Sequence, residues 1–450
     1  MGRRQAQVQQ WEGLRVVHPK AAGLDIGSEE IWAAVAPPGA PAAVRQFGTF
    51  TPDLAALADW LAAHGVDTVA MESTGVYWIP IYELLEERGF EVAVVNAHHL
   101  KNVPGRKSDI QDCQWIQGLH SVGLLRGSFR PAADYVALRA YLRHRATLIE
   151  YRAAHIQHMQ KALQQMNLQL TQVLSDITGV TGMAIIRAIV TGERDPQRLA
   201  AFRQGNCKQN EETIAKALTG NYRREHLFAL EQAVALYDFY TSQLQRCDAE
   251  IEQQFTNLKP IADRLPPLPP SPKPQTHSKN APAYDARTLL YQLTGVDLVA
   301  IAGLNESTVQ TIITELGPNV DAFPTVKHFC SWAGLAPHND ISGGKRLRSR
   351  TLPTNNRIGQ AFRMAAQSVA KSPQSAFGAF YRRMKGRLGT KQAIVATAHK
   401  IARAFYYVLK HRVPFDDLGG EEYERLANAR ERKHLEKRAA KLGLALVLAS

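Results

Sequence analysis

The chain has 450 residues, of which 45% are hydrophobic and 21% charged, and its formal net charge is +13 at pH 7. A chain of this length is too long to fold around one ordinary hydrophobic core, so we expect two or three domains. No apolar run is long enough to span a bilayer, which argues against a helical membrane protein. The first twenty residues lack the apolar core of a signal peptide, so we expect a soluble, cytoplasmic protein.

Cysteine usage and charge narrow the classes further. The four cysteines are scattered, with no Cys-x-x-Cys pair and no histidine at zinc spacing. This pattern indicates neither a disulfide framework nor a structural zinc. The excess of Lys and Arg, 54 against 41 Asp and Glu, favours a polyanionic partner such as nucleic acid.

Residues 16–133 are predicted to form an α/β domain. Apolar alternation predicts two strands joined by a turn over 21–37, and further strands over 42–50, 68–71 and 91–96. Helical spacing follows over 53–63, 79–88 and 108–125, the last with Ser108 as its N-cap. Strands that alternate with helices imply a layered α/β architecture.

Four carboxylates mark strand ends and a helix start in this domain. Asp25 and Glu72 end short apolar runs, and Asp109 and Asp112 are three residues apart. If the fold gathers them, their repulsion needs a compensating cation, and hard oxygen ligands suit Mg²⁺. Two Mg²⁺ ions about 4 Å apart would activate the attacking oxygen and neutralise the leaving oxygen of a phosphoryl transfer. Each acid alone also fits a turn, a cap or a solvated position, and it is the ordered set that favours catalysis.

From residue 134 the pattern becomes helical, and residues 134–262 are predicted to form a helical, coiled-coil region. Apolar residues recur every seventh position from Leu142 to Leu170, which predicts one long helix in a coiled coil. A second helical stretch over 211–258 pairs either with this helix or with another subunit. Seven prolines then predict an extended linker over 263–285.

Residues 286–415 are predicted to form a mainly helical domain, followed by a helical tail over 416–450. Helices over 286–293 and 305–316, joined by glycine turns, resemble a helix-hairpin-helix. Between 341 and 415 there are sixteen Lys and Arg and no Asp or Glu, which favours phosphate binding over a merely solvated face. The predicted nucleic-acid-binding residues are Lys345, Arg346, Arg348, Arg350, Arg357, Arg382 and Arg383.

Ser342 lies at the start of this basic segment, directly before Gly343 and Gly344. A serine before flexible glycines and among cations would present its hydroxyl to a phosphate, while guanidinium groups stabilise the phosphorane. The alternative is an ordinary glycine turn in a basic loop. The sequence leaves both interpretations open.

The ordered acids, the helical region and the run from Gly334 to Lys345 together resemble the transposases of the insertion-sequence-110 family. The resemblance covers residues 20–130 and 290–410. It implies a RuvC-like (ribonuclease H-like) first domain, a coiled coil, and a separate transposase domain with a catalytic serine. By this resemblance Asp25, Glu72, Asp109 and Asp112 would be metal ligands, and Ser342 would form a 5′-phosphoserine link to DNA.

The resemblance also implies partners. Donor and target DNA would be recombined under the guidance of a structured bridge RNA that pairs with both. A homo-oligomer of two or four subunits, in a prokaryotic cytoplasm and associated with the nucleoid, would carry out the reaction.

Three other classes compete with this interpretation. A hydrolytic endonuclease of the Holliday-junction type would use the same acids with water as nucleophile and would make Ser342 dispensable. An actin-like ATPase would use Asp25 for nucleotide chemistry, but it predicts a second phosphate loop and an adenosine motif that the sequence lacks. A non-enzymatic nucleic-acid-binding protein explains the basic segment and leaves the ordered acids unexplained.

Overall fold

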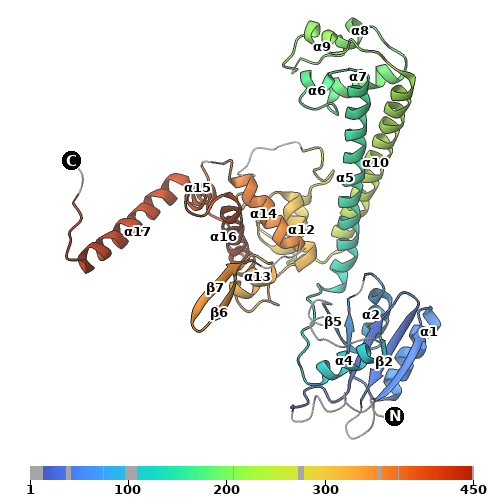
Figure 1. The fold of residues 1–450 in the computed structure, drawn as a ribbon, viewed down its shortest axis with the longest axis vertical. Helices are drawn as coiled ribbons and strands as arrows, with labels where there is room; N and C mark the ends of the chain where they lie inside the picture. Colours follow the sequence, from blue (N-terminus) through green and yellow to red (C-terminus); the bar gives the residue numbers. More distant parts are fainter. Residues whose placement is uncertain are drawn as a thin grey trace. The chain divides into compact units, whose positions relative to one another are not determined.

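A computed structural model describes residues 14–36, 42–73, 75–96, 109–205, 207–271, 278–351, 356–372 and 374–447 (Figure 1). The chain divides into two compact units, one ending at Arg130 and the other beginning at Pro131. The predicted N-cap Ser108, and Pro272 and Pro274 of the predicted linker, lie outside the described residues.

The first unit is built on a five-stranded mixed sheet of order β3-β2-β1-β4-β5. The antiparallel pairs are β1–β2 and β2–β3, and the parallel pairs are β1–β4 and β4–β5. The α/β architecture predicted from alternation is confirmed, and the mixed sheet fits a ribonuclease H-like fold. The strands are β1 (Ala21–Ile26), β2 (Glu30–Val35), β3 (Ala43–Gly48), β4 (Thr68–Glu72) and β5 (Glu91–Val95).

Helices cover both faces of this sheet. The helices α1 (Thr51–Ala63) and α2 (Trp78–Glu87) pack on one face, where Leu24 and its alternate neighbours join the main core. On the other face α4 (Asp109–Ser121) packs against β1, β2 and β4. Burial of alternate apolar side chains on opposite sides of each strand therefore produces two layers of helices around one sheet.

Gly23 explains how closely α4 approaches the sheet. A Cβ atom at Gly23 would lie 2.4 Å from the Cys113 carbonyl oxygen and 2.3 Å from the Gln117 amide nitrogen. Only glycine leaves room for this contact between β1 and the helix backbone. The contact also brings the beginning of α4 toward the end of β1.

The second unit begins with two long helices, α5 (Ala133–Gln165) and α10 (Arg224–Asn257), which lie side by side and run in opposite directions (Figure 1). The second helical stretch therefore pairs with the first within one chain. Buried side chains between them and the elements at their far end include Met159, Leu163 and Leu230. The coiled-coil geometry itself stays a prediction.

Two predicted helix boundaries in this region are wrong. The helix predicted through Leu170 ends at Gln165, because Asn167 adopts a left-handed conformation with φ of 55°. A separate short helix, α6 (Leu170–Val173), follows. The stretch predicted over 211–258 is two helices, α9 (Glu211–Ala217) and α10. Between them the Asn221 amide donates to the Met166 carbonyl at 3.0 Å, so a turn-to-turn contact replaces helical hydrogen bonds. The elements between α6 and α9 are α7 (Val180–Val190) and α8 (Pro196–Ala200).

The predicted linker forms neither helix nor strand in its described part, yet it is fixed to the long helices. The buried Arg145 of α5 pairs with Asp248 of α10 and donates to the carbonyls of Asn280 and Ala281 at 3.1 Å each. Arg152 donates to the Asn280 side chain at 2.7 Å. Buried guanidinium groups thereby bind backbone that the prolines keep out of regular structure.

The rest of the second unit is mainly helical, as predicted, with one hairpin that the sequence analysis treated as a loop. Stacked and edge-on rings of Phe329, Phe362 and Phe405 form its core. The helix-hairpin-helix geometry stays a prediction. None of the described helices is both long and apolar enough to cross a membrane. The elements are α11 (Ala286–Thr294), η2 (Leu298–Ala300), α12 (Glu306–Leu316), α13 (Val326–Trp332), β6 (His338–Ser342), β7 (Lys345–Arg350), α14 (Arg357–Val369), α15 (Ala376–Leu388), α16 (Thr390–His411) and α17 (Gly420–Lys441).

Candidate catalytic carboxylates and the serine hairpin

Asp25 and Glu72 lie at the carboxyl ends of two neighbouring parallel strands. The register pairs Gly23 with Ala70 and Leu24 with Met71, so the next residues along each strand are Asp25 and Glu72. Alternation puts Asp25 on the same side as Gly23, the side covered by α4. Since neighbouring strands are about 4.8 Å apart, the two carboxyl groups are neighbours on the α4 face.

The other two acids come from the first turn of α4. Asp109 and Asp112 both lie in that turn, next to the contact of Cys113 with Gly23. The pKa of Asp25 is raised from its ordinary value near 3.8 to about 6, first by burial and then by the charges of Asp112, Asp109 and Glu72. Each neighbour disfavours the charged form of Asp25. The fold therefore couples Asp25 electrostatically to all three of the other predicted acids.

The four side chains do not form a preassembled metal site. Among the residues that the structure describes, no three His, Cys, Asp or Glu side chains meet closely enough to hold an ion. The donor chemistry is nevertheless suited to a hard divalent cation, because it consists of carboxylate oxygens, and burial together with the neighbouring charges raises the pKa of Asp25.

Ser342 ends the first strand of an exposed basic hairpin. Gly343 and Gly344 form its two-residue turn, with φ of 55° and 75°, and positive φ at both positions is the conformation of a type I′ turn. All residues of β6 and β7 are exposed. The turn that the sequence suggested is therefore a strand-to-strand connection, which presents the serine hydroxyl to solvent.

A bulge in β7 decides which cations share a face with Ser342. Ser342 pairs with Lys345 and Ile341 with Arg346, but the next pair is Asp340 with Arg348, so Leu347 is an extra residue. Along β6, alternation puts Ser342, Asp340 and His338 on one face. Their partners share that face and are Lys345, Arg348 and Arg350, whereas Arg346 lies on the opposite face with Ile341.

The remaining predicted nucleic-acid-binding arginines take part in ion pairs within the chain. Arg357 lies 3.9 Å from the carboxylate of Glu315, and Arg382 lies 3.0 Å from that of Glu424 in α17. Arg383 pairs with Glu431, also in α17. Sequence reasoning missed these acids because they lie outside the acid-free segment and reach it only in the folded chain.

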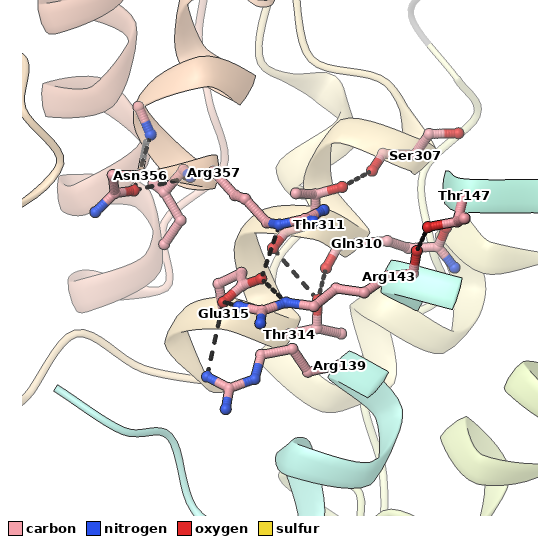
Figure 2. Close-up of polar contacts among 12 residues, drawn as sticks. Arg139, Arg143, Thr147, Ser307, Gln310, Thr311, Thr314, Glu315, Asn356 and Arg357 are labelled. Carbon is pink, nitrogen blue, oxygen red and sulfur yellow. Dashed lines mark hydrogen bonds and ion pairs between the residues drawn. The ribbon is translucent and has the colours of Figure 1, made fainter. Parts of the chain in front are cut away.

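Glu315 is the centre of a polar cluster that joins three helices (Figure 2). Its carboxylate accepts hydrogen bonds from Arg143 of α5 at 2.9 and 2.7 Å, and Arg139 lies 3.7 Å away. With Arg357 of α14, three arginines from two helices converge on one largely buried acid of α12. The spacing of Arg139 and Arg143 by four residues places them on one helix face, but nothing in the sequence identifies Glu315 as their partner.

Comparisons with known proteins match both ends of the chain. A family model for DEDD transposases of the IS110 type, described as "Transposase", matches residues 22–168, which include the four acids. A second, described as "Transposase IS116/IS110/IS902 family", matches residues 297–382, which include Ser342.

Two curated relatives are similar to part of the chain. These are the pilin gene-inverting proteins of Moraxella bovis and Moraxella lacunata, each 30% identical over 122 residues. The match covers 26% of this chain and 38% of each relative, so the chain spans well under half the length of the relatives it matches. The two family models carry the assignment, because they recognise the acid-bearing unit and the serine-bearing hairpin separately and in the expected order. The chain belongs to the IS110 family of transposases.

Proposed function

We propose that this chain is an RNA-guided DNA transposase or recombinase of an insertion sequence, which cuts and rejoins DNA through a covalent phosphoserine. The observation that carries the proposal is the coupling of Asp25 to Glu72, Asp109 and Asp112 at one end of the sheet. Family membership supports it, as do relatives named for the inversion of a pilin gene. Residue roles are those that the family resemblance implies.

Ser342 is the proposed nucleophile. Its Oγ attacks a DNA phosphorus, and the new oxygen–phosphorus bond forms as the bond to the 3′ oxygen breaks. The serine proton ends on that 3′ oxygen, which leaves a 3′-hydroxyl and a 5′-phosphoserine. Attack by another strand's 3′-hydroxyl reverses the step, so rejoining needs no ATP. Lys345, Arg348 and Arg350 share a face with Ser342 and would neutralise charge on the phosphorane.

The carboxylates are the proposed metal ligands. Asp25, Glu72, Asp109 and Asp112 would hold divalent ions, Mg²⁺ by ligand chemistry, which would supply charge neutralisation at the scissile phosphate. The raised pKa of Asp25 supports this role, because burial and the charges of its three acidic neighbours disfavour its carboxylate, and a divalent cation would stabilise that charge.

The proposed partners are donor and target DNA, a structured guide RNA that pairs with both, and further copies of the chain. The acids and Ser342 lie in different units of the chain. A mixture of Asp25→Ala and Ser342→Ala subunits tests whether subunits complement one another. Recovered recombination in the mixture supports an oligomer, and no recovery in any mixture counts against it.

The deciding experiment uses 3′-labelled DNA, the RNA encoded beside the gene, Mg²⁺, and a denaturing gel that separates free DNA from a protein–DNA adduct. The label is at the 3′ end because the serine would be attached to the 5′ end of the downstream fragment, which carries that label. The unmodified chain is expected to form the adduct, and Ser342→Ala to form neither adduct nor cleaved strand. Ser349→Ala is the matched control, because Ser349 lies on the opposite face of the same exposed hairpin.

Two results would overturn the proposal. If Ser342→Ala still cleaves DNA without an adduct, the chain is a hydrolytic nuclease that uses the acids and water. If the unmodified chain binds DNA and RNA but cleaves neither strand with Mg²⁺ or Mn²⁺, it is a binding protein. Loss of cleavage in Asp25→Asn with retained DNA binding separates the catalytic role of the acids from folding.

A further inference from the structure

A cavity of about 480 Å³ lies between α15, α16 and the segment that leads into α17. Its volume is within the range of roughly 300–1,000 Å³ that small-molecule sites occupy. The transposase family match ends at residue 382, so α16 and α17 lie beyond it. Five aromatic rings line the cavity, those of Phe377, Phe380, Tyr407, Phe415 and Tyr423.

Three basic side chains of α16 line the same cavity, His399, Lys400 and Arg403. The Lys400 ammonium lies 4.5 Å from the centre of the Phe380 ring and 4.4 Å from that of Tyr423. Burial, followed by the charges of Arg430 and Arg403, lowers the pKa of Lys400. Burial and Arg403 likewise lower the pKa of His399. Burial first, and neighbouring positive charge second, therefore disfavour the charged forms of both side chains.

Two acids, Asp416 and Asp417, also line the cavity. The oxygens of Asp417 accept hydrogen bonds from the Ser375 hydroxyl and the Ala376 amide at 3.0 Å each and from the Gly419 amide at 3.1 Å. Asp416 is exposed to solvent. Among the residues that the structure describes, neither acid forms an ion pair with Lys400 or Arg403, and the glutamates of α17 that pair with α15 are bound to Arg382 and Arg383.

We propose that this cavity binds one unstacked nucleotide of a single-stranded nucleic-acid segment, with its phosphate at Lys400 and Arg403 and its base against the aromatic wall. An anion relieves the repulsion among the cations, and a planar base matches exposed rings such as Tyr407, which is 46% exposed. Basic grooves with interleaved aromatic rings bind single strands in this way. The inference rests on the proposed function only for the source of the nucleotide.

The test is binding of a fluorescein-labelled thymidine hexamer to the full chain, measured by anisotropy between 50 and about 200 mM salt. Lys400→Met and Arg403→Gln are each expected to weaken binding about tenfold and to reduce the slope of log affinity against log salt by about 0.7, the value for one lost phosphate contact on a single strand. Lys391→Met is the matched control, since Lys391 lies exposed on the same helix and does not line the cavity. It should leave both values nearly unchanged.

A second variant reports on the base. Tyr407→Ala is expected to weaken binding of the hexamer but not of an abasic hexamer, whose affinity for the unmodified chain should already be low. Tyr407 is exposed, so this change spares the core. A uridine RNA hexamer, measured in the same way, compares RNA with DNA at this site.

Three outcomes would overturn the inference. Equal effects of Lys400→Met and Lys391→Met would show that only general charge matters. Equal binding of the abasic and intact hexamers would remove the base from the site. If free thymidine monophosphate displaces the labelled hexamer at concentrations at which unlabelled hexamer does not, the cavity is a site for a free nucleotide. Because the hexamer assay involves no cleavage, it stands even if the chain shows no recombination, so the two proposals fail separately.

Discussion

Ser342 and Lys345 are paired directly across the Gly343–Gly344 turn, and the bulge at Leu347 brings Arg348 onto the same face of the hairpin. A regular strand would instead have grouped Arg346 with Arg348. The bulge therefore places Arg346 and Arg348, which are two residues apart in the sequence, on opposite faces of the hairpin. This separation makes the role of each arginine testable in an otherwise identical setting.

We expect Arg348→Gln to slow formation of the serine–DNA adduct at least about tenfold, because it removes a cation from the face of the proposed nucleophile. Arg346→Gln carries the same charge change on the opposite face and should have a much smaller effect. The measurement is the single-turnover rate at saturating DNA, so that general affinity does not contribute. Equal effects of the two substitutions would contradict the assignment of faces.

The glycine turn gives a second prediction. Gly344 has φ of 75° and open space around it, so Gly344→Ala introduces backbone strain of about 1–2 kcal/mol without a clash. The turn should open, and adduct formation should fall about fivefold or more. Gly386→Ala is the control, because Gly386 also has open space but lies inside α15, where alanine stabilises by about 0.5–1 kcal/mol. A Gly344→Ala chain with unchanged activity would show that the turn conformation is irrelevant.

The Glu315 cluster predicts a stability effect. Glu315→Ala leaves Arg139, Arg143 and Arg357 without their shared acid and should lower the free energy of unfolding by about 1–3 kcal/mol. Hydrogen exchange of the α12 and α14 amides in the full chain would locate the loss. Glu252→Ala, at an exposed position of α10, should change stability by no more than about 0.5 kcal/mol. Unchanged exchange in Glu315→Ala would show that the cluster adds no stability.

His120 predicts a pH dependence of the first unit. Its Nε2 lies 2.9 Å from the Thr68 hydroxyl and its ring stacks on His18, and burial followed by His18 lowers its pKa from 6.5 to about 4. Because the folded pKa lies below the unfolded one, the stabilisation is complete above about pH 6.5 and is lost as the pH falls toward 4. The loss amounts to up to about 3 kcal/mol.

Urea unfolding at pH 7.5, 5.5 and 4.5 measures this effect in the unmodified chain and in His120→Gln. The variant should show a shallower loss of stability on acidification, since the carboxylates common to both chains cancel in the comparison. His64→Gln, at an exposed position, should behave like the unmodified chain. Parallel pH profiles of the unmodified chain and His120→Gln would refute the role of His120.

The contact of α17 with α15 predicts that glutamates limit nucleic-acid binding. The double substitution Glu424→Gln and Glu431→Gln removes the ion pairs of Arg382 and Arg383 with α17, and should tighten RNA binding and steepen its salt dependence by up to about two phosphate contacts. Glu421→Gln with Glu436→Gln changes the charge of the same helix equally at exposed positions. If both pairs tighten binding alike, the ion pairs have no specific effect.

Local patterns in the sequence determined much of this protein. Alternating apolar residues predicted the strands of the first unit, and helical spacing predicted α1, α2 and the start of the long helix α5. Asp25, Glu72, Asp109, Asp112 and Ser342 were identifiable because strand ends, helix starts and glycine turns are encoded by short segments. The ends of α5 and α9 were not, since a left-handed Asn167 and a contact to Met166 override helical spacing there.

Tertiary structure alone decided how these residues meet. The absence of a side chain at Gly23 lets α4 pack closely against β1. Only this packing brings Asp109 and Asp112 near Asp25, whose pKa is raised by burial and then by its three acidic neighbours. The pairing of β6 with β7 determines which cations of the hairpin share a face with Ser342. Glutamates of α17, distant in the sequence, form ion pairs with Arg382 and Arg383. Side-chain partners from distant segments are set by packing, and packing depends on the whole fold rather than on any short stretch of sequence.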